Sequence, residues 1–282
     1  MKKIILILVV LSVSAALKAQ SDSSNASQPD TIIVGKFIIV KKNRTVRVNN
    51  LDGSGNTFNI NLGRNRDRKP SNTSTNWFIF DWGFTNYRDQ TDYASANQNP
   101  YLHNGGQPFG KTDFNLQTRS SNVNIWIFMQ KINLSSHILN LKYGLGLNMY
   151  NFRYDNNISY NKSPAYIFRD SIQFSKDKLF TSYATVPLLL NVNTAPNKRN
   201  GFSFSAGVSA GYLVASRNKQ ISTQRGKQKI KGDLNLNKWQ LSYIAELGLG
   251  PVRLYGSYSI TPLHQDALKQ YPYTIGVRFS NW

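Results

Sequence analysis

Hydrophobic and polar residues alternate along much of the chain, most clearly over residues 202–215. From Phe202 to Tyr212 every second residue is apolar, and the positions between them hold only serine and glycine. A period of two places the two sets on opposite faces of a β-strand. The stretch is longer than the about 5–6 residues usual for a soluble strand and suits the roughly 9–11 residues of a tilted transmembrane strand. We therefore predict a membrane-spanning strand with its apolar face toward lipid.

Seven further stretches repeat the alternation, and the connections between the eight predicted strands run long, short, long, short, long, short, long. Long extracellular loops and short periplasmic turns are typical of outer-membrane barrels. We predict an all-β fold, an eight-stranded antiparallel up-and-down transmembrane β-barrel with both termini in the periplasm. Pro187 lies inside one strand, where we expect a bulge. The seven stretches are 76–86, 115–132, 138–153, 179–193, 239–249, 252–261 and 271–282.

The N-terminal region has a different organisation. Residues 1–19 begin with Lys2 and Lys3 before an apolar run too short to act as a membrane anchor, the layout of a secretory signal peptide. Residues 20–75 are predicted to be a periplasmic extension or linker, in which 31–40 and 44–48 could pair as a hairpin; a plug inside the barrel is the alternative. Residues 76–282 then form the barrel, which places the protein in the outer membrane of the cell.

The amino-acid composition limits the cofactors and binding partners that can be expected. The 282 residues include no cysteine, which excludes disulfides and thiolate metal sites, and no metal-ligand spacing or phosphate loop suggests a cofactor. The formal net charge is +20, which indicates an anionic partner. Nucleic acid is disfavoured because the chain is exported and carries no nucleic-acid-binding motif.

Five charged residues fall on the predicted inner face: Asp81, Lys142, Glu246, Arg253 and Arg278. Glu246 and Arg253 are placed symmetrically about a turn and are expected to face each other. Asp81 and Arg278 lie on the first and last strands, which become neighbours when a barrel closes. Since about eight strands leave room only for side chains, we predict a structural network of ion pairs. A selective pore or ligand site is the alternative.

Residues 217–238, predicted to form an extracellular loop, carry seven basic residues against Asp233 alone. Such a loop could bind lipopolysaccharide phosphates through charge-assisted hydrogen bonds, or it could be a solvated loop that keeps the protein soluble. The possible contacts with anionic lipid are Arg217, Lys219, Arg225, Lys227, Lys229 and Lys231.

Several segments resemble the PorT-like outer-membrane β-barrel family of Bacteroidetes. They include YGLGLNMYNFRYDNN at 143–157, TSYATVPLLL at 181–190, GFSFSAGVSAGY at 201–212 and YPYTIGV at 271–277. The resemblance implies an eight-stranded outer-membrane barrel, in a family most of whose members have no assigned function. The family name implies a link to type IX secretion, but no residue here carries that link. Trp282 resembles the terminal aromatic residue that the barrel assembly machinery recognises.

We therefore expect a non-enzymatic, monomeric outer-membrane protein with a structural, envelope or surface-interaction role. The alternatives are a small-solute pore, a protein associated with type IX secretion, and a lipid A-modifying enzyme. Such an enzyme needs a general base near the bilayer edge, which His264 with Asp266, or His103, could supply. No nucleophile stands at a recognisable spacing from them, and His137 falls in a predicted periplasmic turn.

Overall fold

The computed structural model describes residues 30–34, 37–42, 45–50, 58–61, 71–194, 201–249 and 252–280. The chain divides into two compact units, Met1–Lys69 and Pro70–Trp282. The predicted signal peptide at 1–19 and the terminal Trp282 lie outside the described residues.

The first unit contains a four-stranded antiparallel sheet in which consecutive strands pair. The predicted hairpin of 31–40 with 44–48 is present in part, because residues 37–42 pair with residues 45–50, with Val40 opposite Arg47. The segment 31–40 is, however, split between two strands that pair with each other, with Thr31 opposite Val40. Alternation alone does not specify where a long run of β-forming residues reverses direction. The strands are β1 (Asp30–Val34), β2 (Phe37–Lys42), β3 (Thr45–Asn50) and β4 (Phe58–Asn61).

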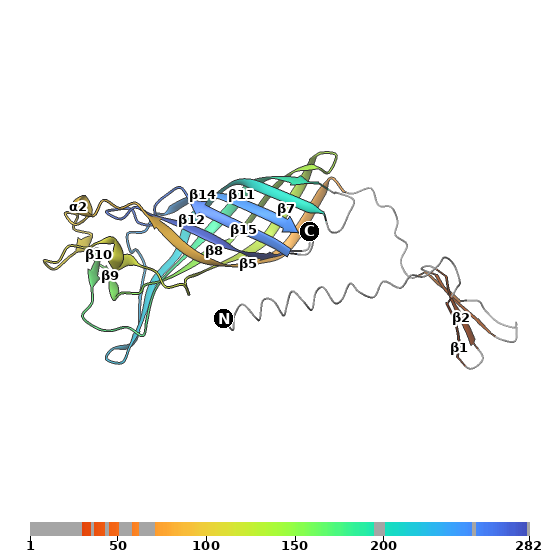
Figure 1. The fold of residues 1–282 in the computed structure, drawn as a ribbon, viewed down its shortest axis with the longest axis horizontal. Coiled ribbons are helices and arrows are strands. Elements are labelled where there is room, and N and C mark those ends of the chain that lie inside the picture. The colour runs from red at the N-terminus through yellow and green to blue at the C-terminus, as the bar shows by residue number, and fades with distance from the viewer. Residues whose placement is uncertain are drawn as a thin grey trace, which may run out of the picture. The chain divides into compact units, whose positions relative to one another are not determined.

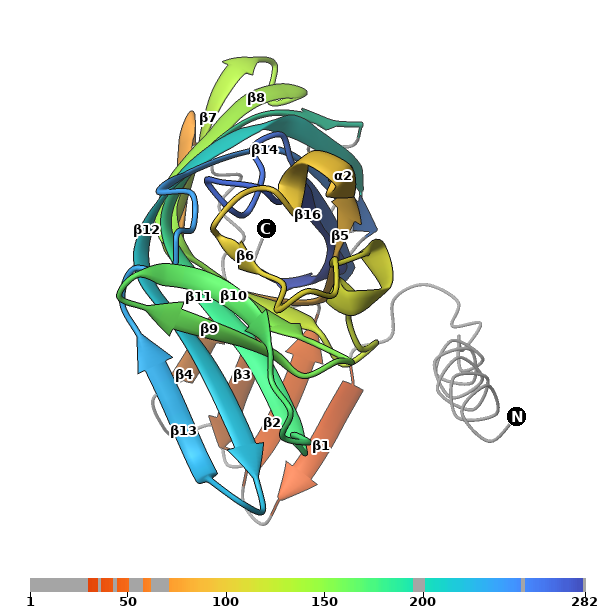
Figure 2. The same cartoon turned by 90° about the vertical axis from the view of Figure 1, so that its left-hand side faces the viewer.

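The second unit is built on one large antiparallel sheet whose strands are arranged around a common axis (Figures 1 and 2). Each strand pairs with the next long strand in the chain, and the last one pairs back onto the first. The strands are β5 (Thr73–Asp89), β7 (Ser121–Ser135), β8 (Leu139–Arg153), β11 (Lys176–Asn193), β12 (Phe202–Ser222), β14 (Trp239–Leu249), β15 (Val252–Ser259) and β16 (Gln270–Phe279).

The bulge predicted at Pro187 is absent. Pro187 pairs in register with Ser209, and the pairing of β11 with β8 resumes at Leu188 in the register it had at Thr185. Proline removes one backbone donor, and here the strand continues past the missing ladder bond. The irregularity between β11 and β12 lies instead at Ser182/Tyr183.

The two faces of the large sheet differ as the alternation predicts. Its outer face exposes a belt of large apolar side chains, among them Trp82, Leu190 and Val208, whereas its inner face buries serine, asparagine and charged residues. Where inner positions are glycine the strands approach closely: a Cβ added to Gly207 would lie 2.0 Å from the carbonyl oxygen of Leu188. No helix among the described residues is long and apolar enough to cross a membrane.

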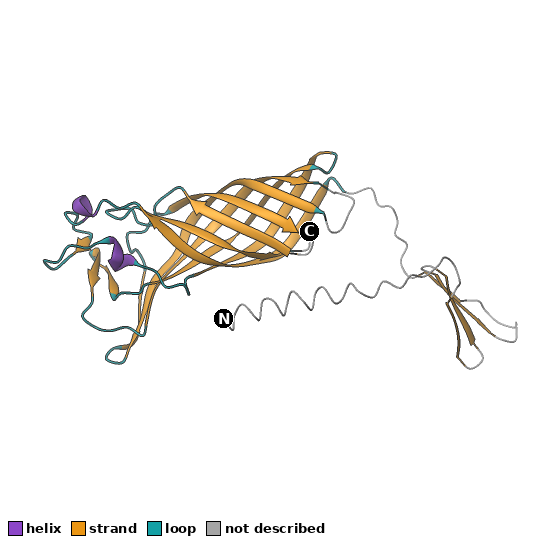
Figure 3. Ribbon diagram, in the orientation of Figure 1, coloured by secondary structure: helices purple, strands orange, loops and turns teal. Residues whose placement is uncertain are grey.

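The long connections were predicted as irregular loops, but at one end of the sheet they fold into a cap (Figures 1 and 3). The cap contains a three-stranded sheet of β6, β10 and β9, and its apolar residues pack into one cluster that includes Phe114, Tyr160 and Leu236. The apolar residues of the cap follow no regular spacing along the sequence. They come from several connections that lie far apart in the sequence, and no single strand or helix presents them on one face. The cap elements are α2 (Tyr93–Ala96), β6 (Leu102–His103), the 3₁₀ helix η1 (Lys111–Phe114), β9 (Ile158–Lys162) and β10 (Ala165–Arg169).

The predicted loop 217–238 is also largely a strand pair. β12 continues to Ser222, and β13 (Gly226–Lys231) folds back along it to form a hairpin beyond the belt. Its lysines alternate with glutamine and isoleucine, so the period of two was present in a segment whose charge suggested a loop.

Candidate functional site: interior network, cap and basic hairpin

The interior of the large sheet is crossed by a connected set of charged side chains. Arg278 of β16 lies directly opposite Asp81 of β5, and its Nε and Nη2 atoms each donate to a different carboxylate oxygen at 2.7 Å. The same carboxylate accepts from the indole of Trp126 at 2.7 Å and from the amide of Asn124 at 3.1 Å. Asp81 is fully buried, and these donors satisfy both of its oxygens.

Glu246 of β14 extends this set across the interior. Its Oε1 accepts from Nη1 of Arg278, and its Oε2 accepts from the ammonium of Lys142, on β8, at 2.8 Å. Ser205 also donates to Oε2, at 3.3 Å. Two acidic and two basic groups therefore form one neutral chain, Asp81–Arg278–Glu246–Lys142, which we call the interior network.

The interior network leaves almost no free space. The cavity beside it has a volume of only ≈ 20 Å³ and is lined by network members together with Asn148 and Tyr255. Tyr255 donates to Asn122 at 2.7 Å, which ties β15 to β7 across the same region. A cavity of this size holds about one water molecule, so the described side chains fill the middle of the interior.

The predicted pairing of Glu246 with Arg253 is wrong in register. Arg253 lies opposite Gly248, and Glu246 lies opposite Tyr255. The hairpin closes with Leu249 opposite residue 252, one residue later than the symmetry assumed in the prediction. Moving the centre of the turn by one residue moves the residue opposite Glu246 by two positions along β15. Glu246 and Arg253 are therefore diagonal neighbours and not a directly opposed pair.

The cap buries a histidine in an aromatic stack. The ring of His264 lies parallel to that of Tyr160, and its Nε2 is 3.1 Å from the hydroxyl of Tyr160, which in turn is 2.6 Å from the hydroxyl of Tyr154. His264 is fully buried, and burial lowers its pKa to about 3. The side chain is therefore neutral at physiological pH and acts as a packing element of the cap.

Asp177 joins the cap to the large sheet, a role that the sequence did not predict. Its side chain points inward from β11, accepts from the backbone amide of Ile158 in β9 at 3.1 Å and accepts from the amide of Asn218 in β12 at 2.9 Å. Burial raises its pKa to about 7, against these two hydrogen bonds, which lower it. The only sequence hint was a lone acidic residue within a basic segment, Lys176-Asp177-Lys178.

The histidines considered as catalytic bases do not form the expected constellation. His264 contacts Tyr160, whereas Asp266 is exposed and accepts from Asn235 at 2.8 Å. The ring of His103 packs against Tyr166, with ring centroids 5.4 Å apart. Among the described residues, no group of three or more histidines and carboxylates is placed to hold a metal ion.

The basic residues predicted to contact anionic lipid fall into two groups. Arg217 and Lys219 on β12 and Lys227, Lys229 and Lys231 on β13 lie at alternate positions, which places them on one face of the hairpin. Arg225, in contrast, lies in the turn between the two strands and pairs with Asp170 at 2.8 Å. Its role is therefore to tie the tip of the hairpin to the cap.

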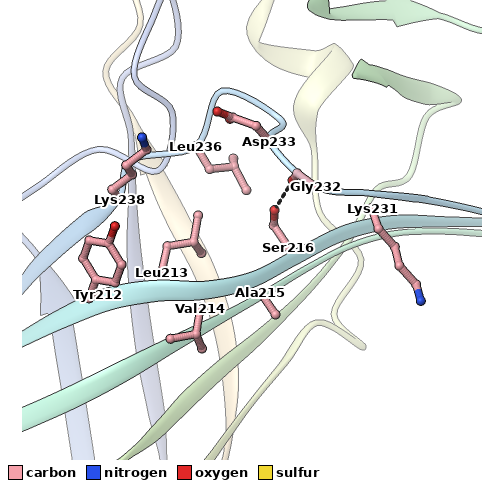
Figure 4. A pocket seen from close by; sticks show the side chains of 10 residues that line it. All are labelled: Tyr212, Leu213, Val214, Ala215, Ser216, Lys231, Gly232, Asp233, Leu236 and Lys238. Atoms are coloured by element: carbon pink, nitrogen blue, oxygen red, sulfur yellow. Dashed lines mark hydrogen bonds between the residues drawn. The ribbon is translucent and has the colours of Figure 1, made fainter. Parts of the chain in front are cut away.

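A pocket of ≈ 390 Å³ opens beside the base of this hairpin (Figure 4). Here β12 is flanked by the segment 232–238, and the hydroxyl of Ser216 donates to the carbonyl of Gly232 at 2.6 Å. The lining is mixed, with apolar side chains from the belt end of β12 and three charged residues, Lys231, Asp233 and Lys238. The pocket thus lies where the apolar and charged parts of the outer surface meet.

We expect acidification to destabilise the cap through His264. The unfolded histidine has a pKa near 6.5 and the folded one a pKa of about 3, so the stabilisation is complete above pH 6.5 and is lost as the pH falls. At pH 4.5 the loss is about 3 kcal/mol. This loss of cap stability can be measured by amide hydrogen exchange of peptides from the cap at pH 7.5 and 4.5. The observed rates are corrected for the pH dependence of intrinsic amide exchange.

The matched variant for this measurement is His264→Phe, which keeps an aromatic ring in the stack and removes the titrating group. Asp177, whose pKa is raised, changes cap stability in the opposite direction over the same pH range and is present in both proteins. The acid-induced loss of protection is therefore expected to be smaller in the variant. Equal losses in the two proteins would show that His264 does not control the response.

An antiparallel sheet that surrounds a polar, filled interior and exposes an apolar outer face defines the class of membrane β-barrels. Residues 110–265, more than half of the chain, match the family described as outer membrane protein beta-barrel domain. The chain belongs to this family, and its β-barrel domain places it in the outer membrane. The comparison with curated proteins gives no match.

Proposed function

We propose that the protein is a closed, eight-stranded up-and-down barrel that spans the outer membrane as a monomer, conducts no solute and catalyses no reaction. The observation that carries the proposal is the interior network, which joins strands on different sides of the barrel and leaves a cavity of only ≈ 20 Å³. A barrel filled in this way has its working surface at its ends and not along a channel. The role is then structural or one of surface interaction, with the cap as the interacting part.

The orientation is part of the same proposal. The strand ends that are joined by short connections, in the pairs β7–β8, β11–β12 and β14–β15, lie together at one end, whereas the connections that form the cap are long. Long loops are extracellular in bacterial barrels, which puts the cap outside the cell and both termini in the periplasm. Within the family, the segments at 143–157 and 201–212 favour a PorT-like member, and the barrel assembly machinery is the proposed route of insertion.

The alternatives have less support in the geometry. A small-solute pore requires open space where the interior network lies. An enzyme that modifies lipid A requires a base and a nucleophile at the bilayer edge, whereas His264 is enclosed in the cap core. No described contact of the chain favours a role in type IX secretion over any other surface role.

Liposome swelling tests the proposal. Vesicles that contain the purified protein are expected to swell in isosmotic arabinose no faster than empty vesicles, with a general porin as the positive control. Glu246→Gln is expected to leave swelling unchanged, because the residue fills space and pairs charges without lining a channel. Swelling above the empty-vesicle rate would contradict the proposal.

Insertion needs its own control, because an unfolded protein would also fail to conduct. The protein in the outer-membrane fraction is expected to migrate differently on a gel before and after boiling, as closed barrels do. The absence of such a shift, or recovery of the protein in the soluble periplasm, would refute the membrane-spanning barrel itself.

A further inference from the structure

Four basic side chains lie directly opposite one another on four neighbouring strands. Arg153 on β8 is paired with Lys178 on β11, Lys178 with Lys219 on β12, and Lys219 with Lys229 on β13. Like charges placed directly opposite each other destabilise a sheet. A row of four across four strands is therefore an arrangement that the fold alone does not favour.

A second row lies beside the first, two residues nearer the belt. It contains Phe180, Arg217 and Lys231, with the guanidinium of Arg217 4.4 Å from the ring centroid of Phe180. A third row, on the other side of the first, adds Lys176 and Lys227. We call the surface formed by the first two rows the basic face; its charged members are Arg153, Lys178, Arg217, Lys219, Lys229 and Lys231.

The protein supplies little negative charge to this surface. None of the ion pairs found among the described residues includes a member of the basic face. Asp177, between Lys176 and Lys178, points to the opposite face of the sheet and is buried. Burial, and then the neighbouring cations, lower the pKa of Lys178 to about 8, as expected for a lysine without an anionic neighbour.

The basic face is continuous with the apolar belt. On β11 the same outward positions carry Leu190, Leu188 and Val186 in the belt and then Phe180 and Lys178 beyond it. A basic surface just beyond the hydrocarbon lies at the depth of lipid headgroups. The pocket of ≈ 390 Å³ is at this boundary, and Figure 4 shows Val214 and Lys231, which line it, on one side of β12.

We infer that the basic face binds the phosphate groups of the lipopolysaccharide of the outer leaflet, with its acyl chains along the adjoining belt. Phosphate oxygens accept charge-assisted hydrogen bonds from arginine and lysine, and several phosphates on one lipid match several cations fixed in rows. The inference rests on the proposed function, because it needs the cap end to face the outer leaflet. It also revises the predicted contact set: Arg153 and Lys178, on other strands, join it, whereas Arg225 and Lys227 leave it.

The test compares the full-length protein with the triple variant Lys178→Gln/Lys219→Gln/Lys229→Gln. A control triple, Lys111→Gln/Arg119→Gln/Lys269→Gln, removes the same charge from exposed positions elsewhere in the cap. Binding of fluorescent bis-phosphorylated lipopolysaccharide in detergent micelles is measured for each, with dephosphorylated lipopolysaccharide and inorganic phosphate as competitors. Heat-modifiability is recorded for every variant.

We expect the affinity to fall at least tenfold in the basic-face variant and to change less than twofold in the control. Phosphorylated lipid should compete, whereas dephosphorylated lipid and millimolar inorganic phosphate should not. Without lipid, the basic-face variant should also melt at a higher temperature than the wild type, because the repulsion between its like charges is reduced. When lipopolysaccharide is added, its melting temperature should rise less than that of the wild type.

Failure of this inference can be distinguished from failure of the proposed function. A folded, heat-modifiable variant that binds lipopolysaccharide as the wild type does would overturn this inference and leave the proposed function intact. Competition by inorganic phosphate as effective as that by the lipid would overturn it in favour of a free-anion site. A wild-type protein without a heat-modifiable barrel in the outer membrane would refute the proposed function and this inference with it.

Discussion

Replacing Arg278 with methionine is expected to lower the free energy of unfolding by about 3–5 kcal/mol, the usual effect of removing one partner from a buried ion pair. Arg278 contacts both Asp81 and Glu246, so its loss removes the ion pair of Asp81 and one of the two ion pairs that Glu246 makes among the described residues. Methionine retains much of the side-chain volume, so the effect reports charge more than packing. Urea unfolding of the protein folded into lipid vesicles, followed by tryptophan fluorescence and by gel mobility, measures it.

The same substitution at Arg88 is the matched control, because Arg88 lies on the neighbouring strand β5 with an exposed side chain. Its cost is expected to stay within about 0.5 kcal/mol. Adding Asp81→Asn and Glu246→Gln to the Arg278→Met variant should recover part of the lost stability, since the uncompensated charges are then removed. A cost at Arg278 no larger than that at Arg88 would show that the interior network only fills space.

An arginine in place of Val208 is expected to cost about 2–4 kcal/mol, the penalty for a cation on the lipid face at the middle of the bilayer. Val208 lies near the middle of the exposed apolar positions of β12, with Leu188 and Tyr243 opposite it on the two neighbouring strands. Val208 is 48% exposed in the isolated chain, so an arginine there can extend away from the protein. The loss of stability therefore reports whether position 208 is surrounded by hydrocarbon or by water.

The comparison variant is Val192→Arg, the same exchange near the end of β11, where the expected cost is about 0–1 kcal/mol because the charge can reach the interface. Both variants are unfolded from vesicles by urea, as above. Similar costs at the two depths would contradict burial of the belt in hydrocarbon. A larger cost at Val208 would support the span and locate its middle.

Much of the large sheet could be predicted from the sequence, because a barrel strand must alternate between two solvents. The polar interior and the lipid each select one parity, and the pattern runs through most of each long strand. It changes parity at Trp77/Phe78 of β5 and at Ile127/Phe128 of β7, so Met129 is buried inside although the alternation predicts it outside. The pairing of Asp81 with Arg278 could be anticipated for the same reason: it follows from the first and last strands being neighbours. The belt and the polar interior were therefore visible before any contact was known.

The sequence by itself thus determined the strand periodicity, the identity of each face and the excess of positive charge. Only the tertiary structure decided which charges meet. Lys142 reaches Glu246 across the interior, a contact between residues 104 positions apart that no local pattern encodes. The partner of Glu246 on the next strand depended on a one-residue difference in the hairpin, which alternation does not specify.

The cap and the basic face depended on the tertiary structure for a related reason. The cap core is formed by apolar residues from several connections that acquire neighbours only when those connections converge. The basic face combines single residues from β8 and β11 with the β12–β13 hairpin, so charge counted along one loop identified only part of it. Periodicity is a property of one strand, whereas a site is a property of the register between strands, and that register is set by the packing of the whole sheet.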